Sequence, residues 1–192
     1  MTRWWWVRHG PTHEKAFTGW RDVPADLSDR AKIQRLSAYL PQNAVLIASD
    51  LHRARATAQA ISTGREPLIT DPRLREFNFG LWDGLHFSEV AARDPILSRQ
   101  YWEEPGDIAP PMGESWNVVA ARVGACVDAL HQQHPNRDII AVAHMGVILT
   151  QIQRASGSTP YQALAQQIDN LSVTQLTWST AGWQTGPINH SP

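Results

Sequence analysis

Arg8, His9 and Gly10 follow directly after a short apolar run, residues 4–7, near the start of the chain. A histidine ring can act as a nucleophile, and an arginine beside it can bind a phosphate through its planar set of N–H donors. A glycine lets the backbone approach a ligand closely. The tripeptide alone also fits an ordinary strand end with two solvated polar side chains. Its significance therefore depends on what the rest of the chain brings to the same place.

Two further apolar runs end in residues of the same chemical kind. Residues 44–48 lead into Ser49, with Arg53 one helical turn further on, and the strand-like run 138–143 leads into His144. In α/β proteins, ligands bind beyond the carboxyl ends of the parallel strands, which lie at one edge of the sheet. The sequence therefore predicts that two histidines and two arginines converge at this edge.

A carboxylate could supply the proton transfers at such a site. Glu76 lies in the segment 74–80, among aromatic residues and next to a glycine. Apolar neighbours raise the pKa of a carboxyl group, which suits a general acid near neutral pH. Glu114 is the competing candidate, but its Gly-Glu-Ser context is typical of the first turn of a helix, where the helix dipole favours a negative charge. The aromatic surroundings favour Glu76.

Strand-like and helix-like runs alternate along the chain, which predicts an α/β fold: a three-layer sandwich with a mostly parallel central sheet flanked by helices. The length of 192 residues and the absence of a linker-like segment favour a single domain over residues 1–192. The segment 95–113, rich in proline and glycine, is expected to be a lid or a surface insertion. The expected strands cover residues 4–7, 44–48, 138–143 and 172–178, with Trp183 on a hairpin partner, and the expected helices cover about 29–40, 52–63, 115–134 and 146–155.

The composition restricts the kinds of partner. A formal net charge of −1 disfavours a nucleic-acid-binding surface, so any anion must be bound by a few local cations. The single cysteine, Cys126, has the spacing of a buried helix face, and its isolation fits a reducing compartment. The apolar run at residues 4–7 is too short for a membrane span or a signal peptide. We expect a cytoplasmic, soluble protein.

The chain resembles the histidine phosphatase superfamily, also called the phosphoglycerate mutase-like family, over nearly its whole length. Each matching piece is modest, but their joint order and spacing are specific. The pieces are Arg8-His9-Gly10-Pro11-Thr12, Phe17-Thr18-Gly19-Trp20, Ser49-x-Leu51-x-Arg53-Ala54-x-x-Thr57-Ala58, Leu74-x-Glu76-x-x-Phe79-Gly80-x-Trp82-x-Gly84, Gly113-Glu114-Ser115, Val142-Ala143-His144 and Asn170-x-Ser172-Val173-Thr174.

This resemblance implies a role for each residue at the predicted sheet edge. His9 would attack phosphorus through one ring nitrogen while a backbone acceptor holds the other. Arg8, Arg53 and His144 would surround the phosphoryl oxygens and stabilise their charge. Glu76 would protonate the leaving alcohol and then activate the water that hydrolyses the phosphohistidine.

The resemblance also ranks the remaining candidates and shows where this chain departs from the family. Thr12 and the backbone near Gly19 would touch substrate or phosphate in a secondary role. The register of the second motif selects Arg53 rather than Arg55. Lys15 stands where the family often has asparagine, and Met145 follows the second histidine where a pair of small residues is common. Neither departure removes a central catalytic group.

The resulting hypothesis is a metal-independent phosphomonoesterase of the phosphatase branch, which hydrolyses a small phosphorylated metabolite. The alternatives are a phosphoglycerate mutase, a non-catalytic module that binds a phosphorylated ligand, and a metallohydrolase built on His9, His13 and His144. The stretch 85–112 holds five acidic residues and two arginines. Such an acidic insertion would repel a phosphorylated sugar acid at close range, which favours the phosphatase over the mutase.

Overall fold

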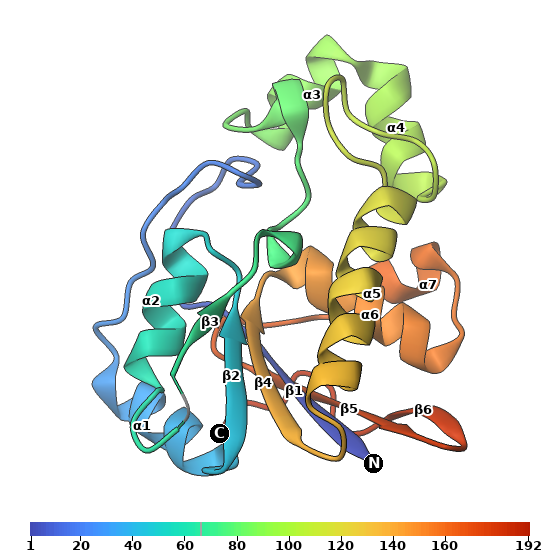
Figure 1. Cartoon of the computed structure of the whole chain (residues 1–192). Helices are drawn as coiled ribbons and strands as arrows, with labels where there is room; N and C mark the ends of the chain where they lie inside the picture. Colours follow the sequence, from blue (N-terminus) through green and yellow to red (C-terminus); the bar gives the residue numbers. More distant parts are fainter. Residues whose placement is uncertain (66) are drawn as a thin grey trace.

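A six-stranded sheet forms the middle layer of the computed structural model, which describes residues 1–65 and 67–192 (Figure 1). The strand order is β3-β2-β4-β1-β5-β6. Strands β1 to β4 run parallel, whereas β5 pairs antiparallel with β1, and β6 pairs antiparallel with β5. The predicted, mostly parallel sheet is therefore confirmed. The strands are β1 (Thr2–Arg8), β2 (Ala44–Ala48), β3 (Ile69–Thr70), β4 (Asp138–Ala143), β5 (Val173–Ser179) and β6 (Gly182–Thr185).

Helices cover both faces of this sheet, as the three-layer prediction requires (Figure 1). Because side chains alternate along a strand, β4 supplies Ile139 and Ala141 to one apolar cluster and Ile140 and Val142 to another. One cluster lies against α1 and α2, and the other lies against α5 and α6. The helices are α1 (Arg30–Tyr39), α2 (His52–Ala60), α3 (Phe87–Arg93), α4 (Pro95–Glu103), α5 (Trp116–Gln133), α6 (Met145–Ser156) and α7 (Pro160–Leu164), with single 3₁₀ turns at Pro72–Leu74 and Gly80–Trp82.

Local signals in the sequence account for several helix boundaries. The Asp29 side chain accepts a hydrogen bond from the Lys32 N–H and so begins α1. Ser115 begins α5 in the same way. Gly157 ends α6 in the left-handed conformation that glycine adopts without strain. The predicted ends of α1, α5 and α6 agree with the structure to within two residues, whereas α2 ends at Ala60, three residues before the predicted end.

The region between residues 87 and 103 contains two helices that the sequence analysis did not predict. The segment 95–113 was predicted as a proline-rich lid or insertion, but its first nine residues form α4, and α3 precedes it. Pro95 stands in the first turn of α4, where the missing N–H has no partner to lose. In Figure 1, α3 and α4 lie at the top of the molecule, beyond one end of the sheet and above the start of α5.

The cysteine and the longest helices have the character expected of core elements. Cys126 is a fully buried thiol in the core, and burial raises its pKa to about 12, so it is a packing residue as predicted. In the part of the chain that the structure describes, no helix has both the length and the apolar character needed to cross a membrane.

Candidate active site

His9 is placed by the backbone at the end of β1. Arg8 pairs with Ala143 of β4, and the His9 N–H donates to the carbonyl oxygen of Ala143 at 3.1 Å. The His9 carbonyl accepts a hydrogen bond from the Asn170 side chain at 2.8 Å. The ring atom Nδ1 lies 2.7 Å from the Gly10 carbonyl oxygen. Since a carbonyl only accepts, Nδ1 must carry the proton, and Nε2 keeps its lone pair for attack.

The surroundings of His9 keep its ring neutral. The pKa of His9 is lowered to about 3, mainly by burial and also by the nearby charges of Arg53 and Arg8, which together outweigh the opposing effect of the Gly10 hydrogen bond. A neutral imidazole is the nucleophilic form. The ring is therefore ready to react throughout the physiological pH range, with no deprotonation step.

His144 lies beside His9 because β1 and β4 are neighbours in the sheet. The two ring centroids are 5.1 Å apart. His144 is fully buried, and neither ring nitrogen has a hydrogen-bond partner among the described residues. Burial, followed by the charge of Arg53, lowers its pKa well below the usual value. Burying an imidazole without hydrogen-bond partners costs free energy. An oxyanion or a hydroxyl bound here would supply a partner for His144 without breaking an existing hydrogen bond.

Arg53, and not Arg55, belongs to this group. Arg53 is 1% exposed, whereas Arg55 is exposed and its guanidinium donates to the Asp50 carbonyl. Arg53 donates to the carbonyl oxygens of Gly19 at 2.6 Å and Arg21 at 2.9 Å. A guanidinium has five N–H donors, so holding this loop leaves capacity for a phosphate.

Arg8 brings the second positive charge. Its Nη1 donates to the Ile168 carbonyl, and its Nε is buried with no partner among the described residues. Burial lowers the pKa of both Arg8 and Arg53, and the nearby negative charge of Glu76 opposes that effect in both. Arg8, Arg53, His9, His144 and Glu76 are thus electrostatically coupled, which is the convergence that the strand ends predicted.

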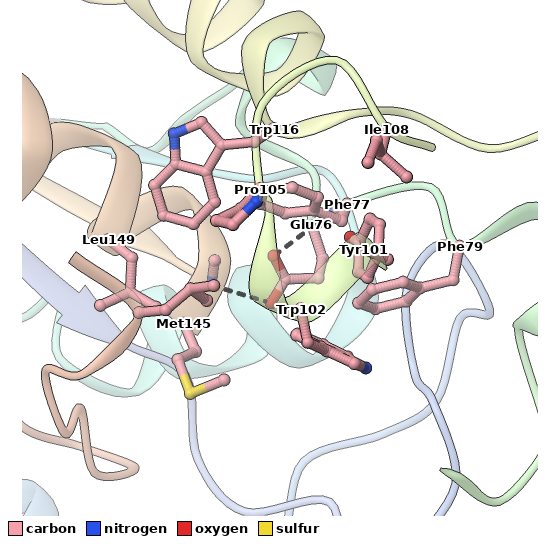
Figure 2. A pocket seen from close by; sticks show the side chains of 12 residues that line it. Glu76, Phe77, Phe79, Tyr101, Trp102, Pro105, Ile108, Trp116, Met145 and Leu149 are labelled. Carbon is pink, nitrogen blue, oxygen red and sulfur yellow. Dashed lines mark hydrogen bonds between the residues drawn. The ribbon is translucent and has the colours of Figure 1, made fainter. Parts of the chain in front are cut away.

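Glu76 is held between its own loop and the start of α6 (Figure 2). Its Oε1 accepts from the Phe77 N–H at 3.0 Å, and its Oε2 accepts from the Gly146 N–H at 3.2 Å. Burial raises the pKa of Glu76, although these two hydrogen bonds and the charges of Arg53 and Arg8 oppose the rise. A carboxyl group that keeps its proton toward neutral pH suits a general acid.

After the second histidine, the position that must be small is 146, and not 145, where this chain has a methionine. A Cβ on Gly146 would lie 2.5 Å from Glu76 Oε1 and 2.5 Å from the Phe77 ring. The small residue is therefore needed at position 146, where the Glu76 carboxylate is bound. Met145 is 40% exposed and lies at the edge of a pocket that starts at Glu76.

The competing carboxylate, Glu114, is committed to another partner. It precedes the N-cap residue Ser115, so its expected place in the first helical turn is wrong. Its two oxygens accept hydrogen bonds from Arg122 at 2.8 and 2.7 Å, and Oε2 also accepts from the Asn78 N–H. Both oxygens of Glu114 are therefore used in holding Arg122 and the backbone at Asn78.

Arg122 was not singled out from the sequence. Besides Glu114, it donates to the backbone carbonyls of Arg73, Arg75 and Glu76 at 2.8–2.9 Å. It therefore fixes the loop that carries the general acid onto α5. No local pattern marks this role, because a lone arginine on a helix is usually a solvated side chain.

Thr12 and Gly19 are placed differently from the five coupled residues. The Thr12 hydroxyl accepts from the Glu14 N–H at 3.4 Å, which is a local contact. The Gly19 N–H donates to Asp83, and a Cβ on Gly19 would lie 2.3 Å from the Phe77 carbonyl oxygen. Gly19 thus allows its loop to pack against the segment that carries Glu76. A phosphate contact by either residue stays a prediction.

Of the three histidines proposed for a metal site, His13 lies apart from His9 and His144. His13 is exposed and its Nε2 lies 2.8 Å from Asp26 Oδ2, in a pair separate from the two buried histidines. Within residues 1–65 and 67–192, no three histidine, cysteine, aspartate or glutamate side chains lie where they could hold a metal ion. The metallohydrolase hypothesis therefore lacks a ligand set in the described part of the chain.

Replacing Arg53 with alanine is expected to lower kcat/KM for a phosphate ester by roughly 10²- to 10³-fold, because a donor aimed at the phosphoryl oxygens strengthens as charge develops on them. Steady-state kinetics and the affinity for inorganic vanadate measure the effect. Arg55→Ala is the matched control on the same helix and should stay within about twofold of the parent. Arg53→Lys keeps the charge and should recover part of the loss; full activity of Arg53→Ala would remove this residue from the phosphate site.

Comparison with known proteins agrees with this geometry. Residues 4–190 match the histidine phosphatase superfamily (branch 1). The chain therefore belongs to the histidine phosphatase superfamily.

Among individual proteins, the chain is similar to the 2,3-bisphosphoglycerate-dependent phosphoglycerate mutase of Brucella ovis, with 31% identity over 176 residues that cover 85% of each chain. It is also similar to the solved structure of a mycobacterial glucosyl-3-phosphoglycerate phosphatase, with a TM-score of 0.86, 29% identity and coverage of 99% of each chain. The bifunctional protein Rv2228c of Mycobacterium tuberculosis is 30% identical over 161 residues. This chain covers 42% of that protein's length, and the matching residues make up 82% of this chain.

Proposed function

We propose that this protein is a phosphomonoesterase that hydrolyses a small phosphorylated metabolite through a phosphohistidine on His9. The observation that carries the proposal is the state of the His9 ring: Nδ1 is held by the Gly10 carbonyl, which leaves the Nε2 lone pair beside two arginines and a second histidine. The similarity to a mycobacterial phosphatase over nearly the whole chain supports the hydrolytic reaction.

The first step transfers the phosphoryl group to the enzyme. Nε2 of His9 attacks phosphorus and forms the P–N bond, while the bond between phosphorus and the ester oxygen breaks. Arg8, Arg53 and His144 stabilise the charge on the phosphoryl oxygens. The Glu76 carboxyl gives its proton to the leaving oxygen, so that an alcohol rather than an alkoxide departs.

The second step returns the enzyme to its starting state. The Glu76 carboxylate takes a proton from water, and the water oxygen attacks phosphorus as the P–N bond breaks. The electron pair returns to Nε2 of His9, and inorganic phosphate leaves. One carboxyl group thus serves as acid and then as base, and both steps use groups that the chain itself supplies.

We also propose that the protein works in the cytoplasm, without a metal ion, on a small-molecule phosphate ester rather than on nucleic acid or a membrane. The net charge of −1 and the single buried cysteine support this setting. The grouping of two arginines and two histidines supplies the cationic and donor groups that a metal ion would otherwise provide.

Phosphoglycerate mutase activity is the second candidate, because the Brucella relative is such an enzyme and Phe17-Thr18-Gly19-Trp20 resembles the mutase form of that loop. A mutase must hold its intermediate away from water and needs cations for the substrate carboxylate. Incubation with 3-phosphoglycerate and a trace of the bisphosphate primer, followed by NMR, separates the two activities. We expect a panel of phosphomonoesters to release phosphate at a rate unchanged by a chelator. Accumulation of 2-phosphoglycerate without matching phosphate release would contradict the phosphatase proposal.

A further inference from the structure

A pocket has the proposed proton donor, Glu76, in its wall, whereas His9, Arg8, Arg53 and His144 do not line it. Glu76 is one of the residues that line it, together with Gly146 at the start of α6. Glu76 protonates the ester oxygen in the proposed mechanism, so whatever is bonded to that oxygen must extend past this carboxyl group. The pocket is thus next to the group that must reach the ester oxygen, and it offers space for the alcohol part of a substrate.

The walls of this pocket are aromatic and aliphatic. Five aromatic side chains contribute to it, from the loop after Glu76, from α4 and from α5 (Figure 2): Phe77, Phe79, Tyr101, Trp102 and Trp116. The Trp116 indole N–H is already bonded to Gln153, at 2.6 Å, and so offers no donor to a ligand. Burial raises the pKa of the Tyr101 hydroxyl, which keeps that group neutral.

The rim of the pocket is apolar as well. Met145 on α6 and Trp102 on α4 both line the pocket, and each is 40% exposed. Trp102 is stacked on Phe17, with ring centroids 6.0 Å apart, so its ring is held in place rather than free on the surface. Large apolar side chains that remain exposed around a cavity are typical of a ligand-binding site.

The acidic residues of the 85–112 stretch do not form this surface. Glu103 and Glu104, at the end of α4, are exposed and do not line the pocket, whereas Tyr101 and Trp102 of the same helix do. Repulsion of an anionic substrate by these acidic side chains stays a prediction, and the pocket walls supply a second cause of selectivity. Among the described residues that line the pocket, Glu76 has the only acidic or basic side chain.

No arginine or lysine is among the described residues that line the pocket. Arg122, on the neighbouring helix α5, is occupied by Glu114 and three backbone carbonyls. A carboxylate or a second phosphate on the leaving group would lose its water here and gain no cation in return, which is strongly unfavourable. An apolar or aromatic leaving group would instead bury its surface against these rings.

From these observations we infer that the substrate is a phosphate monoester whose alcohol part is uncharged and apolar or aromatic, and that the pocket lined by Phe79, Trp102 and Met145 selects it. This inference rests on the proposed phosphatase function and names the substrate class of the same site. It sets the protein apart from enzymes that act on phosphorylated sugar acids, which carry a carboxylate close to the ester.

A series of alkyl phosphates tests the inference, because their leaving alcohols have similar intrinsic reactivity. We expect kcat/KM to rise by about two- to fourfold for each methylene from ethyl to hexyl phosphate. Hexyl and benzyl phosphate should be better substrates than 3-phosphoglycerate and phosphoserine by at least roughly 100-fold. A flat series, or a preference for 3-phosphoglycerate or phosphoserine, would overturn the inference and leave the phosphatase proposal intact.

A charge placed at the rim provides the matching variant. Met145→Lys should lower kcat/KM for hexyl phosphate and raise it for 3-phosphoglycerate, so that the ratio of the two shifts by roughly tenfold or more. Ile96→Lys adds the same charge at a site on α4 that is 72% exposed and does not line the pocket. That control should leave the ratio unchanged. Equal ratios in the two variants would contradict the placement of the leaving group in this pocket.

Binding of non-hydrolysable alkyl phosphonates separates the inference from the proposed function. Their affinity, measured by calorimetry, should rise with chain length in the same way as kcat/KM. If no phosphate ester is hydrolysed but phosphonate affinity still increases from ethyl to hexyl, the pocket assignment stands and the catalytic proposal fails. If affinity is independent of chain length, the pocket assignment fails whatever the catalytic result.

Discussion

Replacing His9 with alanine is expected to abolish formation of the phosphoenzyme and to lower kcat by roughly four orders of magnitude or more, because no other group can take the place of its nucleophilic nitrogen. Rapid quenching of the parent enzyme with a labelled phosphomonoester should trap protein-bound phosphate that is labile to acid and stable to alkali. The pKa of about 3 for His9 predicts that this labelling does not fall between pH 8 and pH 5, since the ring gains a proton only near the lower value.

His13→Ala is the matched control for this variant, since His13 is exposed and bonded to Asp26 outside the coupled group. It should keep both labelling and turnover within about twofold of the parent. If His9→Ala retained the turnover of the parent, or if the trapped phosphate were stable to acid, His9 would not be the nucleophile.

Replacing Glu76 with glutamine is expected to slow phosphoryl transfer from alkyl phosphates by roughly 10²- to 10⁴-fold, because the amide cannot deliver a proton to a poor leaving group. The same step with 4-nitrophenyl phosphate should change by less than about tenfold, since nitrophenolate leaves without protonation. The burst of alcohol or phenol released in the first turnover measures this step alone. The later hydrolysis of the phosphoenzyme should be slow with both substrates, because the same carboxylate activates the water.

The pH dependence gives a second measure of Glu76. Burial raises its pKa, so the carboxyl keeps its proton to a higher pH than an exposed glutamate does. The burst rate with an alkyl ester should therefore fall as the pH rises through this raised value, and the fall should be absent in Glu76→Gln. Glu103→Gln, at an exposed position on α4, is the control and should behave as the parent. Equal losses with alkyl and nitrophenyl esters in Glu76→Gln would exclude the acid role of Glu76.

Much of the phosphate site could be predicted from the sequence, because it depends on local rules. Apolar runs that alternate with helical runs predict a parallel sheet, and parallel strands end at one edge. Once β1 and β4 are neighbours, with Arg8 opposite Ala143, the residues that follow them must lie side by side. His9 and His144 are such residues, which is why their proximity could be predicted.

The choice between Glu76 and Glu114 shows where local rules end. Both carboxylates have aromatic residues and glycines nearby in the sequence, and context could only favour one of them. The structure separates them through Arg122, which pairs with Glu114 and binds the backbone of the Glu76 loop. The hydrogen bond from Arg122 to the Glu76 carbonyl joins α5 to a loop more than 40 residues earlier in the chain. No local sequence pattern predicts a contact over that separation.

The sequence by itself thus determined the layers of the fold, the edge of the sheet where the chemistry lies and the histidines and arginines that lie there, since periodicity and strand direction are local properties. The character of the leaving-group pocket was decided by tertiary structure alone. In the sequence, Glu103 at the end of α4 and the following Glu104 make this segment look acidic, but packing turns Tyr101 and Trp102 toward Glu76 and leaves both glutamates exposed. Which face of a short helix lines a cavity depends on the elements packed against it, and those elements come from distant parts of the chain.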